Sequence, residues 1–233
     1  MPSVLPPWPS PAVPVAGSDD TFPVRHIYCV GRNYAEHAKE MGGDAVREPP
    51  FFFTKPADAV LPVVPPALGH MRYPLGTQDL QHEVELVVAI GRAGAQLDPE
   101  HALEVVYGYA TGLDMTRRDL QIAMREKKRP WDLGKSFAQA APIAPIHRAA
   151  EVGHLERGAI RLSVNGALRQ QGDLEDMIWD VPHTLSFLSQ YYELLPGDLV
   201  FTGTPAGVSA VVAGDRLDGS IEGLSPLSIV VDP

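Results

Sequence analysis

The alternation of hydrophobic and polar positions around Glu83 and Glu85 predicts a strand. In an extended segment successive side chains point to opposite faces, so the two glutamates share a face with Val87 and Ala89. The other face of this segment is apolar throughout, and the glutamate face becomes apolar after Glu85. We therefore expect the two carboxylates where a strand enters the protein interior.

The rest of the chain shows the patterns of short strands and a few short helices, without a steady alternation of the two. The turn Asn165-Gly166 predicts a hairpin, and the prolines that flank the aromatic run at 51–53 predict an edge strand or a short segment there. This arrangement favours an α+β protein, mainly β, with mixed sheets. Strands are also expected at 26–30, 105–113, 199–201 and 227–231 and near Ile221, and helices at 34–41, from Glu100, at 116–127 and from Pro182.

Two carboxylates this close in a partly buried place need a shared proton or a cation. Their oxygens suit Mg²⁺, Mn²⁺ or Ca²⁺, although an exposed strand start with two solvated acids fits Glu83 and Glu85 equally well. Asp114 follows the strand expected at 105–113 and would complete a site of three carboxylates. Its other interpretation is the N-cap of the helix expected at 116–127.

His37 and Glu40 are three residues apart in the helix expected at 34–41, which Asn33 would cap and the glycines at 42–43 would end. Side chains at this spacing lie on one helical face, so the glutamate can orient the imidazole as a general base. An ordinary surface pair on an amphipathic helix is the alternative.

Length and charge narrow the class of protein. The 233 residues fit one large domain, and we expect residues 1–20 to form a proline-rich arm and residues 21–233 a single domain. The net charge of -10 argues against binding to nucleic acid or to an anionic membrane. Small molecules or other subunits are the expected partners.

The single cysteine, Cys29, excludes an intrachain disulfide and a cysteine-based zinc site, and its apolar neighbours predict a buried strand position. No segment approaches the ~20 apolar residues of a membrane span. Prolines interrupt the N-terminal segment, which also lacks the basic start of a signal peptide. These features predict a cytoplasmic protein.

A series of motifs in a fixed order gives these separate patterns a common meaning. Together they resemble the fumarylacetoacetate hydrolase family from about Val24 to the C-terminus, and within it most resemble the fumarylpyruvate and acylpyruvate hydrolases. The motifs are Gly31–His37, Phe52–Pro56, His82–Glu85, Gly112–Gln121, Lys135–Phe137, Val164–Gly166 and Phe201–Val208, and the narrower match adds Arg47–Phe53, Arg129–Asp132, Gln170–Leu174 and Met177–Trp179.

The resemblance implies a mixed β-roll of several sheets, usually in a homodimer, and a role for each matching residue. Mg²⁺ or Mn²⁺ is the expected cofactor, with Ca²⁺ as a possible substitute. Glu83, Glu85 and Asp114 match the metal ligands, His37 and Glu40 the water-activating pair on a lid helix, Lys135 a catalytic position, and Arg32, Lys55, Arg118, Gln121 and Thr204 the positions that line the substrate site. Taken singly, the basic residues of this set read as solvated surface charges.

The activity implied by the resemblance is metal-dependent hydrolysis of a carbon–carbon bond in a 2,4-diketo acid, first of all fumarylpyruvate, which gives fumarate and pyruvate in gentisate-type aromatic breakdown. Other acylpyruvates and decarboxylation of oxaloacetate are the alternatives within the family. A Ca²⁺-stabilised binding module without turnover is the alternative from another class. The acyl group preferred by the enzyme does not follow from the sequence.

Overall fold

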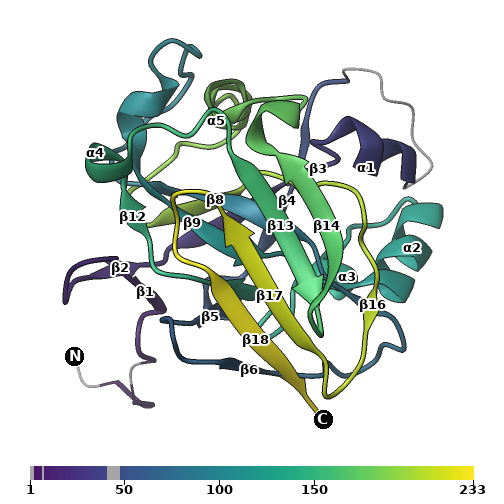
Figure 1. Cartoon of the computed structure of the whole chain (residues 1–233). Coiled ribbons are helices and arrows are strands. Elements are labelled where there is room, and N and C mark those ends of the chain that lie inside the picture. Colours follow the sequence, from purple (N-terminus) through teal and green to yellow (C-terminus); the bar gives the residue numbers. More distant parts are fainter. Residues whose placement is uncertain (1–2, 7, 41–47) are drawn as a thin grey trace.

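The computed structural model describes residues 3–6, 8–40 and 48–233. They form several sheets joined by loops, 3-10 turns and short helices, as Figure 1 shows. The expected mainly β, α+β class is confirmed, and the sheets are mixed because parallel and antiparallel pairs occur in the same sheet. Within the described ranges no helix has the length and apolar composition needed to cross a membrane.

The largest sheet in the described part of the chain has eight strands, and β8 lies near its centre. Every residue of β8 is buried, which matches a strand covered on both faces. The aromatic strand β4 is at the sheet edge, as its prolines predicted. In sheet order the strands are β4 (Phe51–Lys55), β3 (His26–Gly31), β15 (Asp198–Phe201), β8 (Val84–Ile90), β9 (Val106–Leu113), β11 (Ala141–Ile143) and β5 (Val60–Pro62), and β12 (His147–Arg148) also pairs with β9.

A five-stranded sheet covers one side of the central strands, with β17 against β9 and β13 against β8 (Figure 1). The predicted hairpin is confirmed, since Asn165 (φ 51°) and Gly166 (φ 79°) both adopt the left-handed conformation that its two-residue turn requires. The order of this sheet is β14 (Ala167–Asp173), β13 (Ala159–Val164), β17 (Arg216–Ile221), β18 (Leu227–Asp232) and β6 (Gly69–Arg72).

The helices are short and lie around the sheets (Figure 1). The predicted helix with Pro182 in its first turn is confirmed. Asp180 caps this helix by accepting from the His183 N–H. The helix expected at 34–41 begins at Ala35, and its predicted end lies outside the described residues. The α-helices are α1 (Ala35–Glu40), α2 (Arg118–Glu126), α3 (Asp132–Lys135), α4 (Ala149–Val152) and α5 (Val181–Ser189), and 3-10 turns occur at Ala57–Ala59, Ala102–Val105 and Leu174–Asp176.

Two helix predictions were partly wrong because strand pairing competes for the same backbone. Near Glu100 only a 3-10 turn forms, and the Val105 carbonyl accepts from the N–H groups of Gly91 and Arg92 instead of continuing a helix. Residues 116–117 form a strand before α2 begins. This strand, β10 (Thr116–Arg117), pairs with β7 (Leu80–Gln81), which also pairs with β16 (Ala210–Val211).

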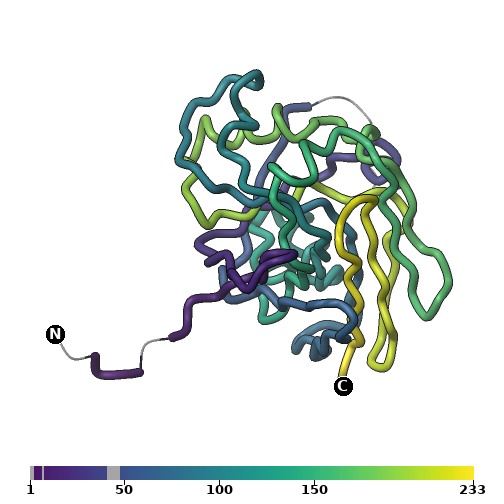
Figure 2. Tube along the Cα trace, turned by 60° about the vertical axis from the view of Figure 1, so that its left-hand side comes forward, coloured from purple at the N-terminus to yellow at the C-terminus, as the bar shows by residue number. Residues whose placement is uncertain are grey.

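The proline-rich segment is partly built into the body. β1 (Ala12–Pro14) pairs with β2 (Thr21–Pro23), and the Ala16 N–H donates to the Ile146 carbonyl. The described residues before β1 run away from the body in Figure 2, and Trp8 is 88% exposed. The segment expected to be an arm therefore contains one strand, and the boundary at residue 20 stays a prediction.

Candidate metal centre and active site

Three buried carboxylates meet where β8 and β9 lie side by side. Ligand oxygens of Glu83, Glu85 and Asp114 lie within 4.8 Å of one another. The pairing places Glu85 opposite Gly112, and the Asp114 N–H donates to the Glu83 carbonyl at 2.8 Å. The interpretation of the glutamates as solvated residues is wrong, because they are only 5% and 1% exposed. Asp114 is not an N-cap either, since α2 is preceded by Arg117.

Three cationic side chains contact two of the carboxylates, Glu83 and Asp114. The Lys135 ammonium lies 2.8 Å from Glu83 Oε2 and 2.7 Å from Asp114 Oδ2, and the Arg118 guanidinium also contacts Glu83. The Lys55 ammonium lies 2.8 Å from Asp114 Oδ1. All three cations are buried, so their interpretation as surface charges is wrong. These three cations are tolerated in the interior because each is paired with Glu83 or Asp114.

The two glutamates lie in opposite electrostatic environments. Burial opposes ionisation of Glu83, but Lys135 and Arg118 outweigh it and lower the pKa of this carboxyl. Burial raises the pKa of the Glu85 carboxyl well above its ordinary value, and the neighbouring Asp114 and Glu83 add to the shift. A hard divalent cation fits the three carboxylates, because its charge removes the repulsion between them and its preferred ligands are oxygens.

Gly203 supports Glu85 from the neighbouring loop, where its N–H donates to Glu85 Oε2 at 2.7 Å. Its φ of 98° lies in the left-handed region, and a Cβ at this position would approach the Asn33 Cβ to 2.7 Å. Glycine is therefore needed for both the backbone conformation and the close packing that deliver this N–H to the carboxylate.

His37 and Glu40 form the predicted pair on α1. His37 Nδ1 lies 3.2 Å from Glu40 Oε2, and the same carboxylate accepts from the Gly207 N–H at 3.2 and 3.3 Å. His37 is buried, while the Glu40 side chain is 36% exposed. The pair therefore joins α1 to the loop after β15 and presents the imidazole to the pocket that also contains Glu83 and Glu85.

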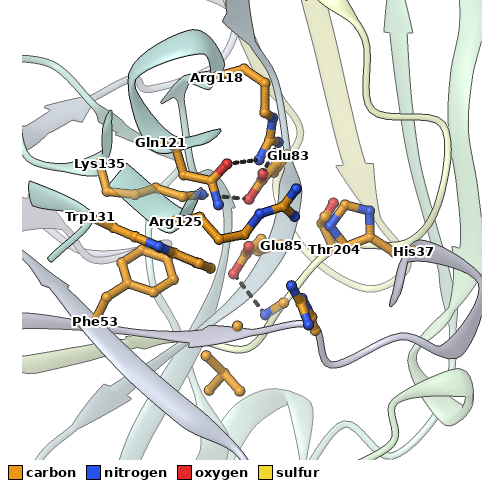
Figure 3. A pocket seen from close by; sticks show the side chains of 14 residues that line it. His37, Phe53, Glu83, Glu85, Arg118, Gln121, Arg125, Trp131, Lys135 and Thr204 are labelled. Atoms are coloured by element: carbon orange, nitrogen blue, oxygen red, sulfur yellow. Dashed lines mark hydrogen bonds and ion pairs between the residues drawn. The ribbon is translucent and has the colours of Figure 1, made fainter. Parts of the chain in front are cut away.

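This pocket, drawn in Figure 3, brings together most of the predicted site residues from elements far apart in the sequence. Lys55 is not among its lining residues, because its ammonium is held by Asp114 and by the carbonyls of Met115 and Lys135. Of the predicted residues, Arg32, His37, Glu83, Glu85, Arg118, Gln121, Lys135 and Thr204 line the pocket.

Lys135 and Gln121 differ in what they offer to a substrate. The Lys135 ammonium bonds Glu83, Asp114 and the Thr116 hydroxyl, so all three of its N–H groups are used inside the cluster. Gln121 accepts from Arg118 through Oε1 at 3.3 Å, and its amide NH₂ is turned toward the pocket in Figure 3. Gln121 is therefore better placed than Lys135 to donate a hydrogen bond to a substrate.

Sequence reasoning missed the aromatic wall of the pocket and one of its cations. Phe53 and Trp131 have ring centroids 5.7 Å apart and lie beside Arg125 in the lining. Arg125 follows Gln121 by four residues and Arg118 by seven on α2, so helical periodicity would have placed all three on one face. The two aromatic residues belong to β4 and to the turn before α3, and no local pattern connects them.

Gln170 of β14 is another residue whose role at the site was not predicted. Its side chain joins the hairpin to the site. Its Oε1 accepts from His82 Nδ1 at 2.8 Å and from the Val84 N–H at 3.1 Å. Its Nε2 donates to Thr204 Oγ1 and to the Pro205 carbonyl at 2.7 and 2.8 Å. A buried amide with these four partners fixes the start of β8 relative to the loop that carries Thr204.

The comparisons with known proteins agree with this fold and site. The family model of the fumarylacetoacetate (FAA) hydrolase C-terminal domain matches residues 26–232. The chain therefore belongs to the fumarylacetoacetate hydrolase family. The mixed β-roll implied by the resemblance is confirmed as its fold.

Three relatives describe its neighbourhood in that family. The crystal structure of fumarylpyruvate hydrolase from Pseudomonas aeruginosa in complex with Mn²⁺ and pyruvate has a TM-score of 0.98 and 53% identity over 99% of each chain. A fumarylpyruvate hydrolase from Ralstonia sp is 44% identical over 80% of this chain and 94% of its own length. A mitochondrial oxaloacetate tautomerase from Rattus norvegicus is 39% identical over 89% of this chain and 92% of its own.

Proposed function

We propose that this protein is a metal-dependent hydrolase that cleaves fumarylpyruvate to fumarate and pyruvate. The main support is one observation: His37, which pairs with Glu40, lines the same pocket as Glu83 and Glu85 of the buried three-carboxylate cluster. The relative with Mn²⁺ and pyruvate supports it independently, since pyruvate is one of the expected products. An enzyme that works in gentisate-type aromatic breakdown would use this reaction.

Glu83, Glu85 and Asp114 would hold the cation, with Mg²⁺ or Mn²⁺ preferred and Ca²⁺ as a substitute. When bound, the cation acts as a Lewis acid toward the oxygens of the pyruvyl half and stabilises negative charge that develops there. Arg118 and Lys135 hold the Glu83 carboxylate in place and keep it ionised. Their charges also attract the anionic substrate into the pocket.

His37 is the proposed general base. It takes a proton from water, which attacks the C4 carbonyl of the diketo acid, while Glu40 holds the imidazole in orientation. Gln121 and Arg32, which line the same pocket, can donate to the oxygen that becomes negative in this step. Lys135 stabilises this negative charge by electrostatic attraction and not by a hydrogen bond, because its three N–H groups already have partners.

The C3–C4 bond then breaks, and its electron pair moves into the pyruvyl half as an enolate. The acyl half leaves as fumarate with the oxygen from water. The enolate takes a proton at C3 to give pyruvate, and protonated His37 can supply that proton. The second proton of the water is released to solvent when the new carboxyl group of fumarate ionises, which balances the reaction. Closure of α1 over the pocket would keep bulk water away from the enolate.

A parallel assay of fumarylpyruvate, acetylpyruvate and oxaloacetate with Mn²⁺ tests the proposal. We expect fumarylpyruvate to be consumed fastest, with loss of its enol absorbance, release of pyruvate and full inhibition by EDTA. Faster turnover of oxaloacetate would favour an activity on oxaloacetate, the substrate in the name of the rat relative. Stabilisation by Ca²⁺ without any turnover would favour the binding module.

We also propose a homodimer in which residues 21–233 of each subunit form one catalytic domain, working in the cytoplasm. The support is the family resemblance and the composition. Light scattering after size-exclusion chromatography tests the dimer, since a monomeric mass would contradict it. Fractionation of the native cells tests the location, and recovery outside the cytoplasm would contradict it.

A further inference from the structure

We propose that Arg125 determines substrate specificity by binding the distal carboxylate of the acyl arm. This inference rests on the proposed function and deepens it, because it defines the preferred acyl group as one that ends in a carboxylate. Fumarylpyruvate carries such a group, whereas acetylpyruvate ends in a methyl group. The two substrates share the pyruvyl half, so a residue at the far end of the pocket can distinguish them.

The first support is the position of Arg125 on α2. Arg118, Gln121 and Arg125 lie on one face of the helix, and all three line the pocket. Arg118 contacts Glu83 at the metal end. Seven residues of helix place Arg125 about 10 Å further along the axis, which is on the scale of an extended diketo dicarboxylate. α2 therefore carries pocket-lining side chains from its first turn to its last.

The second support is the distribution of charge. The buried cations Lys55, Lys135 and Arg118 are each paired with a carboxylate of the cluster. In the proposed function the metal held by the cluster binds the pyruvyl half of the substrate. The carboxylate at the other end of the substrate needs a cation of its own, because burying an unpaired charge is costly. A guanidinium suits this task, since it can bind a carboxylate with two parallel hydrogen bonds.

The third support is the wall next to Arg125. Trp131 packs edge-on against Phe51, with ring centroids 5.2 Å apart, and its ring also lies beside that of Phe53. Phe53 and Trp131 line the pocket together with Arg125, whose guanidinium points into it in Figure 3. An aromatic wall beside a cation fits an apolar unsaturated arm that ends in a carboxylate.

Arg32 is the competing candidate for this task. It also lines the pocket, and its φ of 58° shows that the loop holds it in an uncommon conformation. It lies in the segment between β3 and α1, next to Asn33, whose amide bonds the carbonyls of Trp179 and Thr202. This position is on the side of His37, so we expect Arg32 to act near the reacting carbonyl rather than at the distal end of the arm.

The test measures kcat/KM of Arg125→Gln, Arg125→Lys and Arg32→Gln on fumarylpyruvate and acetylpyruvate. The exposed Arg129 provides a matched control, Arg129→Gln, outside the pocket. Arg125→Gln should lower kcat/KM for fumarylpyruvate about 100-fold, as expected for loss of a charge-assisted contact, and should affect acetylpyruvate much less. Arg125→Lys should recover part of the loss, because it restores the charge.

An equal loss on both substrates would overturn the proposal, since it would assign Arg125 to the pyruvyl half or to folding. A selective loss in Arg32→Gln but not in Arg125→Gln would overturn it as well. Hydrolysis by the wild type decides the proposed function separately. If the wild type hydrolysed neither substrate, titration calorimetry with fumarate and with pyruvate would still test the role of Arg125. The proposal predicts that Arg125→Gln weakens fumarate binding and leaves pyruvate binding unchanged.

Discussion

The two halves of the pocket are built in different ways. The carboxylates stand at the start of β8 and directly after β9, paired central strands of the largest sheet in the described ranges, and buried cations hold Glu83 and Asp114. His37 and Glu40 stand on α1, a helix of six residues, and Glu40 is partly exposed. The strand side is held by sheet pairing and buried ion pairs, whereas Glu40 on the helix side accepts from the Gly207 N–H of the loop after β15.

This difference explains how the site can hold a buried charged cluster and still adjust the position of its general base. Like charges held together need a rigid surrounding, and the sheet supplies it through backbone pairing on both sides of β8. Proton transfer needs only one imidazole at the right place, which a short helix can bring in when substrate is bound. Variants on the strand side should therefore change metal binding and folding, and variants on the helix side should change turnover alone.

The largest effect is expected from Glu85→Gln. The variant should lose activity and the stabilisation by Mn²⁺, which for the wild type is about 2.7 kcal/mol at a concentration 100 times Kd. The metal-free variant should be no less stable than the wild type, because the change removes repulsion by Glu83 and Asp114 while the amide still accepts from Gly203.

Thermal unfolding with Mn²⁺ or with EDTA measures both parts of this prediction. Glu193→Gln, at an exposed position, is the control and should behave as the wild type. A variant at Glu85 that still gains stability from Mn²⁺ would show that this carboxylate is not a ligand.

His37→Ala should lower kcat by about 10²–10⁴-fold, the usual contribution of a general base, and leave stabilisation by Mn²⁺ intact. Steady-state kinetics and unfolding with and without Mn²⁺ measure the two effects. His183→Ala is a matched control, because His183 has a carboxylate partner three residues away, Asp180, and does not line the pocket. Weaker Mn²⁺ binding in His37→Ala would assign the imidazole to the metal site.

Gln170→Ala should lower the free energy of unfolding by about 2–3 kcal/mol, because it leaves buried partners such as the Val84 N–H unsatisfied. Turnover should fall as well, since Thr204 loses its support. Denaturation by urea measures the first effect. The adjacent Gln171 is exposed, so Gln171→Ala is the control, and an equal loss in both variants would contradict the role given to Gln170.

The smallest effect is expected from Glu40→Ala, about a 10- to 100-fold loss of kcat, by analogy with carboxylates that orient other functional histidines. Water can replace part of its role because the side chain is partly exposed. Stability should change little. Glu36→Ala on the same helix is the control, since Glu36 is exposed and pairs with Lys39. A loss equal to that of His37→Ala would show that orientation is as important as the base itself.

Local patterns predicted much of the fold and part of the site. Alternation around Glu83 and Glu85 placed both carboxylates on one face, and the spacing of His37 and Glu40 placed them within contact on α1. The edge position of β4 and the hairpin at Asn165 also followed from local rules. The motifs also identified the family, because their order along the chain can be read directly from the sequence.

The sequence by itself determined the strands, the turn and the pairs that lie close in the chain, because backbone geometry fixes the directions of neighbouring side chains. The motifs implied that Asp114 joins Glu83 and Glu85, and the structure confirms it. The pairing of Lys55 with Asp114 and the position of Arg125 in the same pocket as Trp131 follow from the tertiary structure alone. It also replaced helix by strand at residues 116–117. The reason is that strand pairing and burial join residues distant in the chain, and no local periodicity encodes which of them meet.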